Sequence, residues 1–142
     1  MVARMERYEI AQYIRDTRSV SNDPKVEQAA LRNMYAHTVH LSAADRFLDS
    51  YFHTDHAARS PFVIALHHTV SVQIESILPL STKTWQVRWR EDTHDLNGAQ
   101  ISAPTYWEAE LQTELVTPKD SDSIISNPLG LFVQNLAWTQ EQ

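Results

Sequence analysis

In the first half of the chain, apolar positions recur at the three- and four-residue spacing of an amphipathic helix. The first such stripe consists of Ile10, Tyr13, Ile14 and Thr17. It predicts a helix from about Arg4 to Ser19, with charged side chains on the other face. A second helix is expected to begin after Asn22, because Asp23 is a good N-cap residue and Pro24 fits the first helical position.

A third apolar stripe follows a sequence that resembles a helix-capping box. The segment 42–45 reads Ser-Ala-Ala-Asp, with aspartate in place of the usual glutamate. The stripe that follows consists of Ala44, Phe47, Leu48, Tyr51 and Phe52. The Ser60-Pro61 pair is predicted to end the helical region, since proline disfavours helical backbone at the residue before it.

In the second half of the chain the hydrophobic period changes to two, which indicates half-buried β-strands. Three segments alternate apolar and polar side chains: 69–75, 85–90 and 107–115. A fourth strand is predicted between Leu131 and Thr139. Helices followed by consecutive strands predict an α+β fold, in which the helices pack on one face of an antiparallel sheet.

The Asn97-Gly98 pair predicts a hairpin turn between the second and third strands. A two-residue loop would set apolar positions opposite charged ones and mix the two faces of the sheet. A three-residue loop that closes on Asp95 and Ala99 keeps the tryptophans of both strands on one face. We therefore predict the longer loop, with Gly98 left-handed, and a compensating bulge near Pro104 as the alternative.

The composition excludes several classes of function. The 142 residues carry a net charge of −6 and include no cysteine and only two glycines. The sequence therefore has no disulfide framework, cysteine-zinc site, thiol nucleophile or glycine-rich phosphate loop. The acidic balance argues against general binding of nucleic acid. The longest apolar run, Phe62 to Leu66, is far shorter than the ~20 residues of a membrane-spanning helix.

Two groups of polar side chains could carry chemistry, but each has a simpler interpretation. Among the seven histidines, His53 and His56 have the i, i+3 spacing that suits zinc. The histidines fall at helix ends and in connections, where they are ordinarily exposed, and no third ligand is indicated. The segment 91–95, with two aspartates, Glu91 and His94, could supply a general acid or base but approaches a turn that is normally exposed. We therefore expect no metal, no cofactor and no catalysis.

The segment 127–130, Asn-Pro-Leu-Gly, is the sharpest local signal. Asn127-Pro128 favours a turn, and Gly130 allows a positive φ two residues later. Apolar residues, among them Leu129 and Phe132, surround it. Two interpretations fit equally well: a tight turn that starts the last strand, or a rigid apolar turn against which a partner docks.

With these features together, the sequence resembles the TrbF-type conjugal transfer proteins, small inner-membrane components of type IV secretion systems. The segments that carry the resemblance occur in order along the chain: 14–20, 78–81, 84–89, 95–98 and 127–133. The last of these is followed by Leu136, Trp138 and Glu141, as in the C-terminal signature of that family.

The resemblance implies a nuclear-transport-factor-two-like (cystatin-like) fold, with N-terminal helices packed on a curved four-stranded antiparallel sheet. It implies a non-catalytic assembly component that associates weakly with itself and contacts other channel subunits, without direct contact with nucleic acid. Residues 1–142 are then a single periplasmic domain, and the inner-membrane anchor of the family is absent from this chain. The alternative is a small pocket enzyme or a carrier of an apolar ligand on the same cone-shaped fold.

The family links its Asn-Pro-x-Gly motif to subunit interaction, so the resemblance implies an interaction surface at this turn. The residues expected at or beneath that surface are Asn127, Pro128, Leu129, Gly130 and Phe132. A second candidate surface is the first helix, where Arg15, Asp16 and Arg18 are expected to be exposed.

Overall fold

The computed structural model describes residues 2–53 and 59–141. The helical half contains α1 (Val2–Arg18), α2 (Pro24–Ala36), α3 (Ala43–His53) and the short α4 (Pro61–Ile64). The second half contains β1 (His68–Pro79), β2 (Thr84–Asp95), β3 (Thr105–Leu115), α5 (Ser121–Ser126) and β4 (Leu131–Glu141). The predicted order of three helices and four strands is confirmed.

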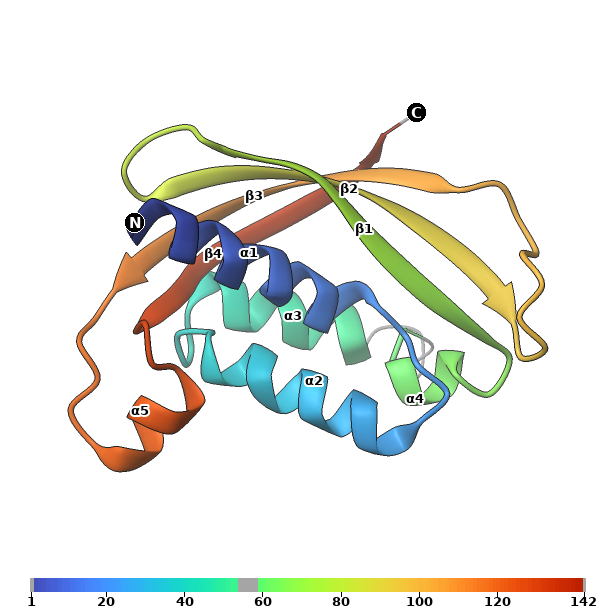
Figure 1. Cartoon of the computed structure of the whole chain (residues 1–142), viewed down its shortest axis with the longest axis horizontal. Coiled ribbons are helices and arrows are strands. Elements are labelled where there is room, and N and C mark those ends of the chain that lie inside the picture. The colour runs from blue at the N-terminus through green and yellow to red at the C-terminus, as the bar shows by residue number, and fades with distance from the viewer. Residues whose placement is uncertain (1, 54–58, 142) are drawn as a thin grey trace.

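The four strands form one antiparallel sheet in the order β1-β2-β3-β4. Helices α1, α2 and α3 lie on the same side of the curved sheet (Figure 1). Helix α1 contacts both β1 and α2, and α3 contacts β4. The α+β prediction is confirmed, and the helical layer is attached to both edge strands. No helix in the described part of the chain is long and apolar enough to span a membrane.

The start of α2 follows its sequence signal, whereas the start of α3 differs slightly from its own. The Asp23 carboxylate accepts a hydrogen bond from the N–H of Lys25, and proline occupies the first turn of α2. At α3, the hydroxyl of Ser42 accepts from the N–H of Asp45 at 3.2 Å. The Asp45 carboxylate in turn accepts from the N–H of Leu41, so the capping pair spans one residue more than the predicted box.

The prediction that Ser60-Pro61 ends the helical region was wrong. Pro61 occupies the first turn of α4, with Ser60 before it in extended conformation. Proline both disfavours helix at the preceding residue and has the φ required at the start of a new helix. A Ser-Pro pair can therefore mark either the end of one helix or the start of the next.

The tip of the β2–β3 hairpin has the predicted three-residue loop. The N–H of Asp95 donates to the carbonyl of Ala99 at 2.8 Å, and Gly98 has φ +91°. Away from the tip the pairing shifts by two residues. Residue 101 bonds to residue 93 and residue 107 pairs with residue 89, so six residues on the β3 side correspond to only four on β2. The irregularity near Pro104, predicted as the alternative, thus occurs together with the longer loop. Because it shifts the register by two residues, each side chain stays on its own face of the sheet.

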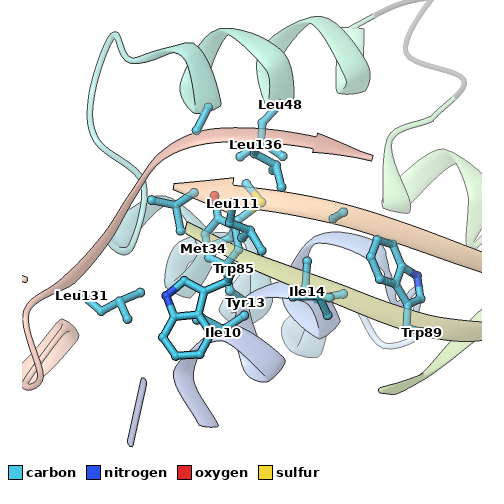
Figure 2. Close-up of a cluster of buried hydrophobic side chains, with 14 of the residues drawn as sticks. Ile10, Tyr13, Ile14, Met34, Leu48, Trp85, Trp89, Leu111, Leu131 and Leu136 are labelled. Atoms are coloured by element: carbon cyan, nitrogen blue, oxygen red, sulfur yellow. The ribbon is translucent and has the colours of Figure 1, made fainter. Parts of the chain in front are cut away.

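The hydrophobic core lies between the sheet and the helices. Ile10 and Ile14 of α1 are fully buried and lie with Trp85 and Trp89 of β2 in one cluster (Figure 2). The predicted tryptophan face is confirmed, with Trp107 half-buried at its margin. Burying one large apolar side chain contributes roughly 1.5–3 kcal/mol, so this cluster is the main source of stability.

Candidate interaction site

The Asn127 side chain holds the 127–130 turn together from the inside. Asn127 is 2% exposed. Its Oδ1 accepts hydrogen bonds from the N–H groups of Gly130 and Leu131, and its Nδ2 donates to the Leu131 carbonyl at 2.7 Å. Nδ2 also donates to the carbonyl of Ala36, at the end of α2, at 3.3 Å. One carboxamide thus satisfies both backbone groups of Leu131 and ties the turn to the helical layer.

Gly130 is required for two separate reasons. Its φ is +73°, a conformation that side chains with a Cβ rarely adopt. A Cβ at this position would also lie 1.8 Å from the carbonyl oxygen of Val116. The Val116 N–H donates to the Gly130 carbonyl at 2.7 Å, so the two backbones are held in contact. Asn127 and Gly130 therefore lie beneath the surface and define its shape.

The exposed part of the turn lies beside the first half of α1. Pro128 is exposed and Leu129 is half-buried. With α1 they line a hollow of about 470 Å³ whose residues are Arg4, Met5, Tyr8, Glu9, Pro128 and Leu129. The side chains of Met5 and Tyr8 are 47% and 65% exposed. We call the four apolar residues of this hollow, Met5, Tyr8, Pro128 and Leu129, the α1–turn surface.

Phe132 does not belong to this surface. It is half-buried and lines a second hollow, of about 270 Å³, together with residues 116–120, Ser123 and Asn127. The neighbouring α5 exposes Ile124 and Ile125, the latter by 81%. The structure therefore brings Pro128 and Leu129 together with α1, and separates Phe132 from them.

The expectation that Arg15, Asp16 and Arg18 are exposed was wrong. Asp16 is 7% exposed and Arg18 is 9% exposed, while Arg15 is half-buried. The reason is helical geometry, because Arg18 continues the four-residue spacing of Ile10 and Ile14 and lies on the core-facing side of α1. The second candidate surface is therefore largely internal.

Arg18 forms a buried ion pair with Glu91 of β2. Its Nε and Nη2 donate to the two carboxylate oxygens at 2.6 and 2.9 Å, and the Trp89 indole N–H donates to the same carboxylate at 2.8 Å. The guanidinium stacks over Trp107 at 4.1 Å and over Trp138 at 5.0 Å. Glu91 was expected near an exposed turn, but it continues the alternation of the β2 tryptophans and points into the core.

An open hollow adjoins this ion pair, and we call it the arginine–aromatic hollow. Its volume is about 660 Å³, and its lining is Arg18, Phe47, Ser50, Tyr51, Arg59, Trp107, Trp138, Thr139 and Gln140. The Tyr51 hydroxyl accepts a hydrogen bond from Arg18 Nη1 at 2.9 Å. Arg18 is thus held by Glu91 and Tyr51, and Arg59 lies over the Tyr51 ring at 5.2 Å. Four of the nine lining residues are aromatic.

Comparison with known proteins identifies the family. The sequence profile of the VirB8 protein family matches residues 2–141. The chain belongs to the VirB8 family. The conjugal transfer protein TrbF of Rhizobium radiobacter is 26% identical over 139 residues, which are 97% of this chain and 60% of that protein. The chain therefore spans about three fifths of the length of this relative.

Solved structures of type IV secretion proteins have the same fold. The TrwG component from Bartonella birtlesii superimposes with a TM-score of 0.79 at 21% identity, covering 97% of this chain and 92% of that one. The VirB8 protein of Agrobacterium tumefaciens gives a TM-score of 0.80 at 16% identity, covering 96% and 90%. These structures confirm the predicted nuclear-transport-factor-two-like fold. The family match and the TrbF relative confirm the predicted resemblance to type IV secretion components.

In this VirB8-family domain, carboxyl groups are buried between α1 and α2. Asp16 accepts hydrogen bonds from Gln12 at 3.0 Å and from Asn33 at 2.5 Å, and burial raises the pKa of Asp16. Glu27 is 2% exposed and accepts from the N–H of Ser21. Burial raises the pKa of Glu27, whose Oε2 has no hydrogen-bond partner among the described residues. Sequence reasoning placed neither carboxyl group inside.

The described histidines of this VirB8-family chain range from exposed to buried, with His68 and His94 half-buried. His40 and His53 have largely exposed side chains, as expected. His37 is only 3% exposed, so for this residue the expectation was wrong. His37 lies three residues after the buried Met34, a spacing that places both on one helix face. His56 lies outside the described residues, and within 2–53 and 59–141 no three potential metal ligands come together.

Proposed function

We propose that this domain is a non-catalytic assembly component of a channel for conjugative DNA transfer. It acts by weak self-association and by contacts with other channel subunits, without binding nucleic acid directly. The VirB8 family and the TrbF relative support this role. We further propose that residues 1–142 are a single periplasmic domain of a longer protein anchored in the inner membrane, and the greater length of TrbF supports this.

The observation that carries the proposal is the α1–turn surface. Met5 and Tyr8 are one helical turn apart and are both exposed. Methionine and tyrosine are enriched at protein interfaces, so their exposure on one helix face favours an interaction surface there. They adjoin a turn that is held rigid by the buried Asn127 side chain. A preformed apolar surface loses little conformational entropy on binding, which favours association.

Substitution of Tyr8 by arginine tests this surface. Tyr8→Arg places a charge on the α1–turn surface without touching the core, so cooperative thermal unfolding should be retained. Self-association, measured by sedimentation velocity, should weaken by about 10-fold or more, as for an interface residue that contributes at least ~1.4 kcal/mol. Conjugative transfer in a complementation assay should fall in parallel.

Val26→Arg is the matched control, because Val26 is 51% exposed on α2, away from the hollow. It should change neither association nor transfer. Pro128→Ala tests the exposed part of the turn itself. Gly130→Ala is unsuitable for this purpose, because the added Cβ would collide with the Val116 backbone and a loss of interaction could not be separated from a loss of folding. Unchanged association and transfer in Tyr8→Arg would refute the assignment of this surface.

The arginine–aromatic hollow favours a second candidate function, the carriage of a small apolar aromatic ligand. Trp107 and Trp138 line a space of about 660 Å³ beside two arginines: Arg18, which is paired with Glu91, and Arg59, which lies over the Tyr51 ring. Titration with indole, followed by NMR of the tryptophan side-chain N–H signals, would show saturable shifts for these two residues. Shifts that are uniform or absent would remove this candidate.

A further inference from the structure

The contacts of His37 determine where its protons lie. Its Nδ1 is 2.8 Å from the backbone carbonyl of Asn33. A carbonyl oxygen can only accept a hydrogen bond, so Nδ1 carries a proton. In a neutral ring the other nitrogen, Nε2, then has a lone pair and no proton.

Nε2 faces a carboxylate. Glu9 of α1 places Oε2 at 3.2 Å from Nε2 of His37. An ionised carboxylate is also only an acceptor, so a neutral ring would set two lone pairs against each other in a site where His37 is 3% exposed. The arrangement is favourable when His37 carries protons on both nitrogens and forms an ion pair with Glu9. The contact is one of charge, because Nε2 makes no well-directed hydrogen bond.

The other groups around His37 are consistent with a positive charge. Asp16 of α1 interacts with it electrostatically as a second carboxylate. From β4, Val133 contributes only its N–H, which donates to the His37 carbonyl at 2.7 Å. The Tyr13 hydroxyl, the remaining titratable group nearby on α1, is engaged with Thr38 at 2.7 Å, and burial raises its pKa. The described cation in this network is Arg15 of α1, which interacts electrostatically with Asp16.

The ion pair connects two parts of the α1–turn surface. Glu9 lines the same hollow as Met5, Tyr8, Pro128 and Leu129, and its side chain is 21% exposed. On the other side, the carbonyl of Ala36 accepts from the Asn127 side chain that organises the turn. His37 therefore lies between the helix and the turn that form the surface.

We propose that the His37–Glu9 pair is a pH-dependent clamp that controls self-association through the α1–turn surface. With His37 protonated, the Glu9 carboxylate is held at the end of α2, at the margin of a hollow that it lines together with Arg4 and the four apolar residues. Loss of the proton releases the Glu9 carboxylate into the hollow, where it must be desolvated on association. Self-association is thus stronger at mildly acidic pH than at mildly alkaline pH. This inference rests on the proposed function.

The test is sedimentation velocity of the full chain at pH 6 and pH 8, about half a unit below and one and a half units above the ordinary histidine pKa of about 6.5. The wild-type dissociation constant should rise by about 5-fold or more from the lower pH to the higher, the range of a typical coupling between two equilibria. Glu9→Gln and His37→Gln should each remove this dependence. His53→Gln is the matched control, because His53 forms an exposed pair with Asp49 at 3.3 Å, and it should retain the dependence.

NMR of the histidine ring nitrogens gives a second readout that does not need association. In the wild type at pH 6 the His37 ring should show two protonated nitrogens, and Glu9→Gln should change the His37 ring signals at that pH and leave those of His53 unchanged. Equal association at both pH values, or His37 ring signals that are the same in the wild type and in Glu9→Gln, would overturn the clamp. A chain that stays monomeric at both pH values would overturn the proposed function, and with it control of association by the clamp. If His37→Gln does not fold, the Glu9→Gln variant alone decides.

Discussion

Replacing Asn127 by alanine tests whether the turn is held from the inside. The substitution removes the partners of the Leu131 N–H and carbonyl, which the carboxamide satisfies at 3.2 and 2.7 Å. A buried polar backbone group without a partner costs roughly 1–3 kcal/mol, so two of them give about 2–6 kcal/mol. The Gly130 N–H keeps the Asn127 carbonyl as an acceptor at 3.0 Å and adds little to this cost.

Urea unfolding followed by tryptophan fluorescence measures this loss as a change in the free energy of unfolding. Asn135→Ala is the control, because Asn135 is an exposed asparagine of β4, and its loss should stay within about 0.5 kcal/mol. A cost below about 1 kcal/mol for Asn127→Ala, with an unchanged slope, would refute the argument. The turn would then owe its shape to proline and glycine alone.

Asn127→Asp adds a pH dependence to the same test. The carboxylate keeps the acceptor but faces the carbonyl groups of Ala36 and Leu131, which can only accept. Burial and these neighbours favour the neutral acid, so the pKa in the folded state lies above the unfolded value of about 3.9. Folding then binds a proton, so relative to wild type the contribution of this group to stability is fully present below about pH 4 and is lost as the pH rises through the folded-state pKa.

Three further outcomes follow from the structure. Gly130→Ala should lower stability by more than about 3 kcal/mol or prevent folding, whereas Gly98→Ala, which meets no atom within 4 Å, should cost about 1 kcal/mol; thermal unfolding compares them. Arg18→Met should cost roughly 3–5 kcal/mol because it leaves Glu91 buried without its partner, and urea unfolding should show recovery when Glu91→Gln is added. Burial raises the pKa of Glu27, so its ionisation opposes folding and its contribution to stability falls as pH rises through that pKa. Glu27→Gln should therefore reduce the pH dependence of the urea midpoint between about pH 4 and 7.

The sequence was sufficient for the sheet because each strand has a polar face. The alternation of residues 85–90 and 107–115 determines which side chains face the helices, and the hairpin loop preserves this assignment. The sequence was insufficient for the exact pairing, because the irregularity near Pro104 changes the register by an even number and leaves the hydrophobic pattern unaltered.

The buried charges were missed for a different reason. Arg18 and Glu91 both fall on the inward phase of their elements, but charged residues are ordinarily outside and were interpreted so. Each can be buried because the other neutralises its charge, and the two are 73 residues apart in sequence. Such a partner is a property of the tertiary structure, and spacing within either element cannot indicate it. The exposed part of the candidate site could not be predicted from the sequence for the same reason. Met5 and Tyr8 lie near one end of the sequence and Pro128 near the other, and only the tertiary structure brings them into one hollow.

The attachment of α3 to β4 has a consequence for biosynthesis. The β1–β2 and β2–β3 hairpins are local and can pair while the chain is still being made, but the strand that covers the apolar stripe of α3 is the last of the four strands to be translated. Contacts of such long sequence separation form late, because the intervening chain must first be closed. Until residue 141 has left the ribosome, the stripe of α3 and the free edge of β3 remain available to chaperones. A protein truncated before β4 is therefore expected to be recognised as unfinished.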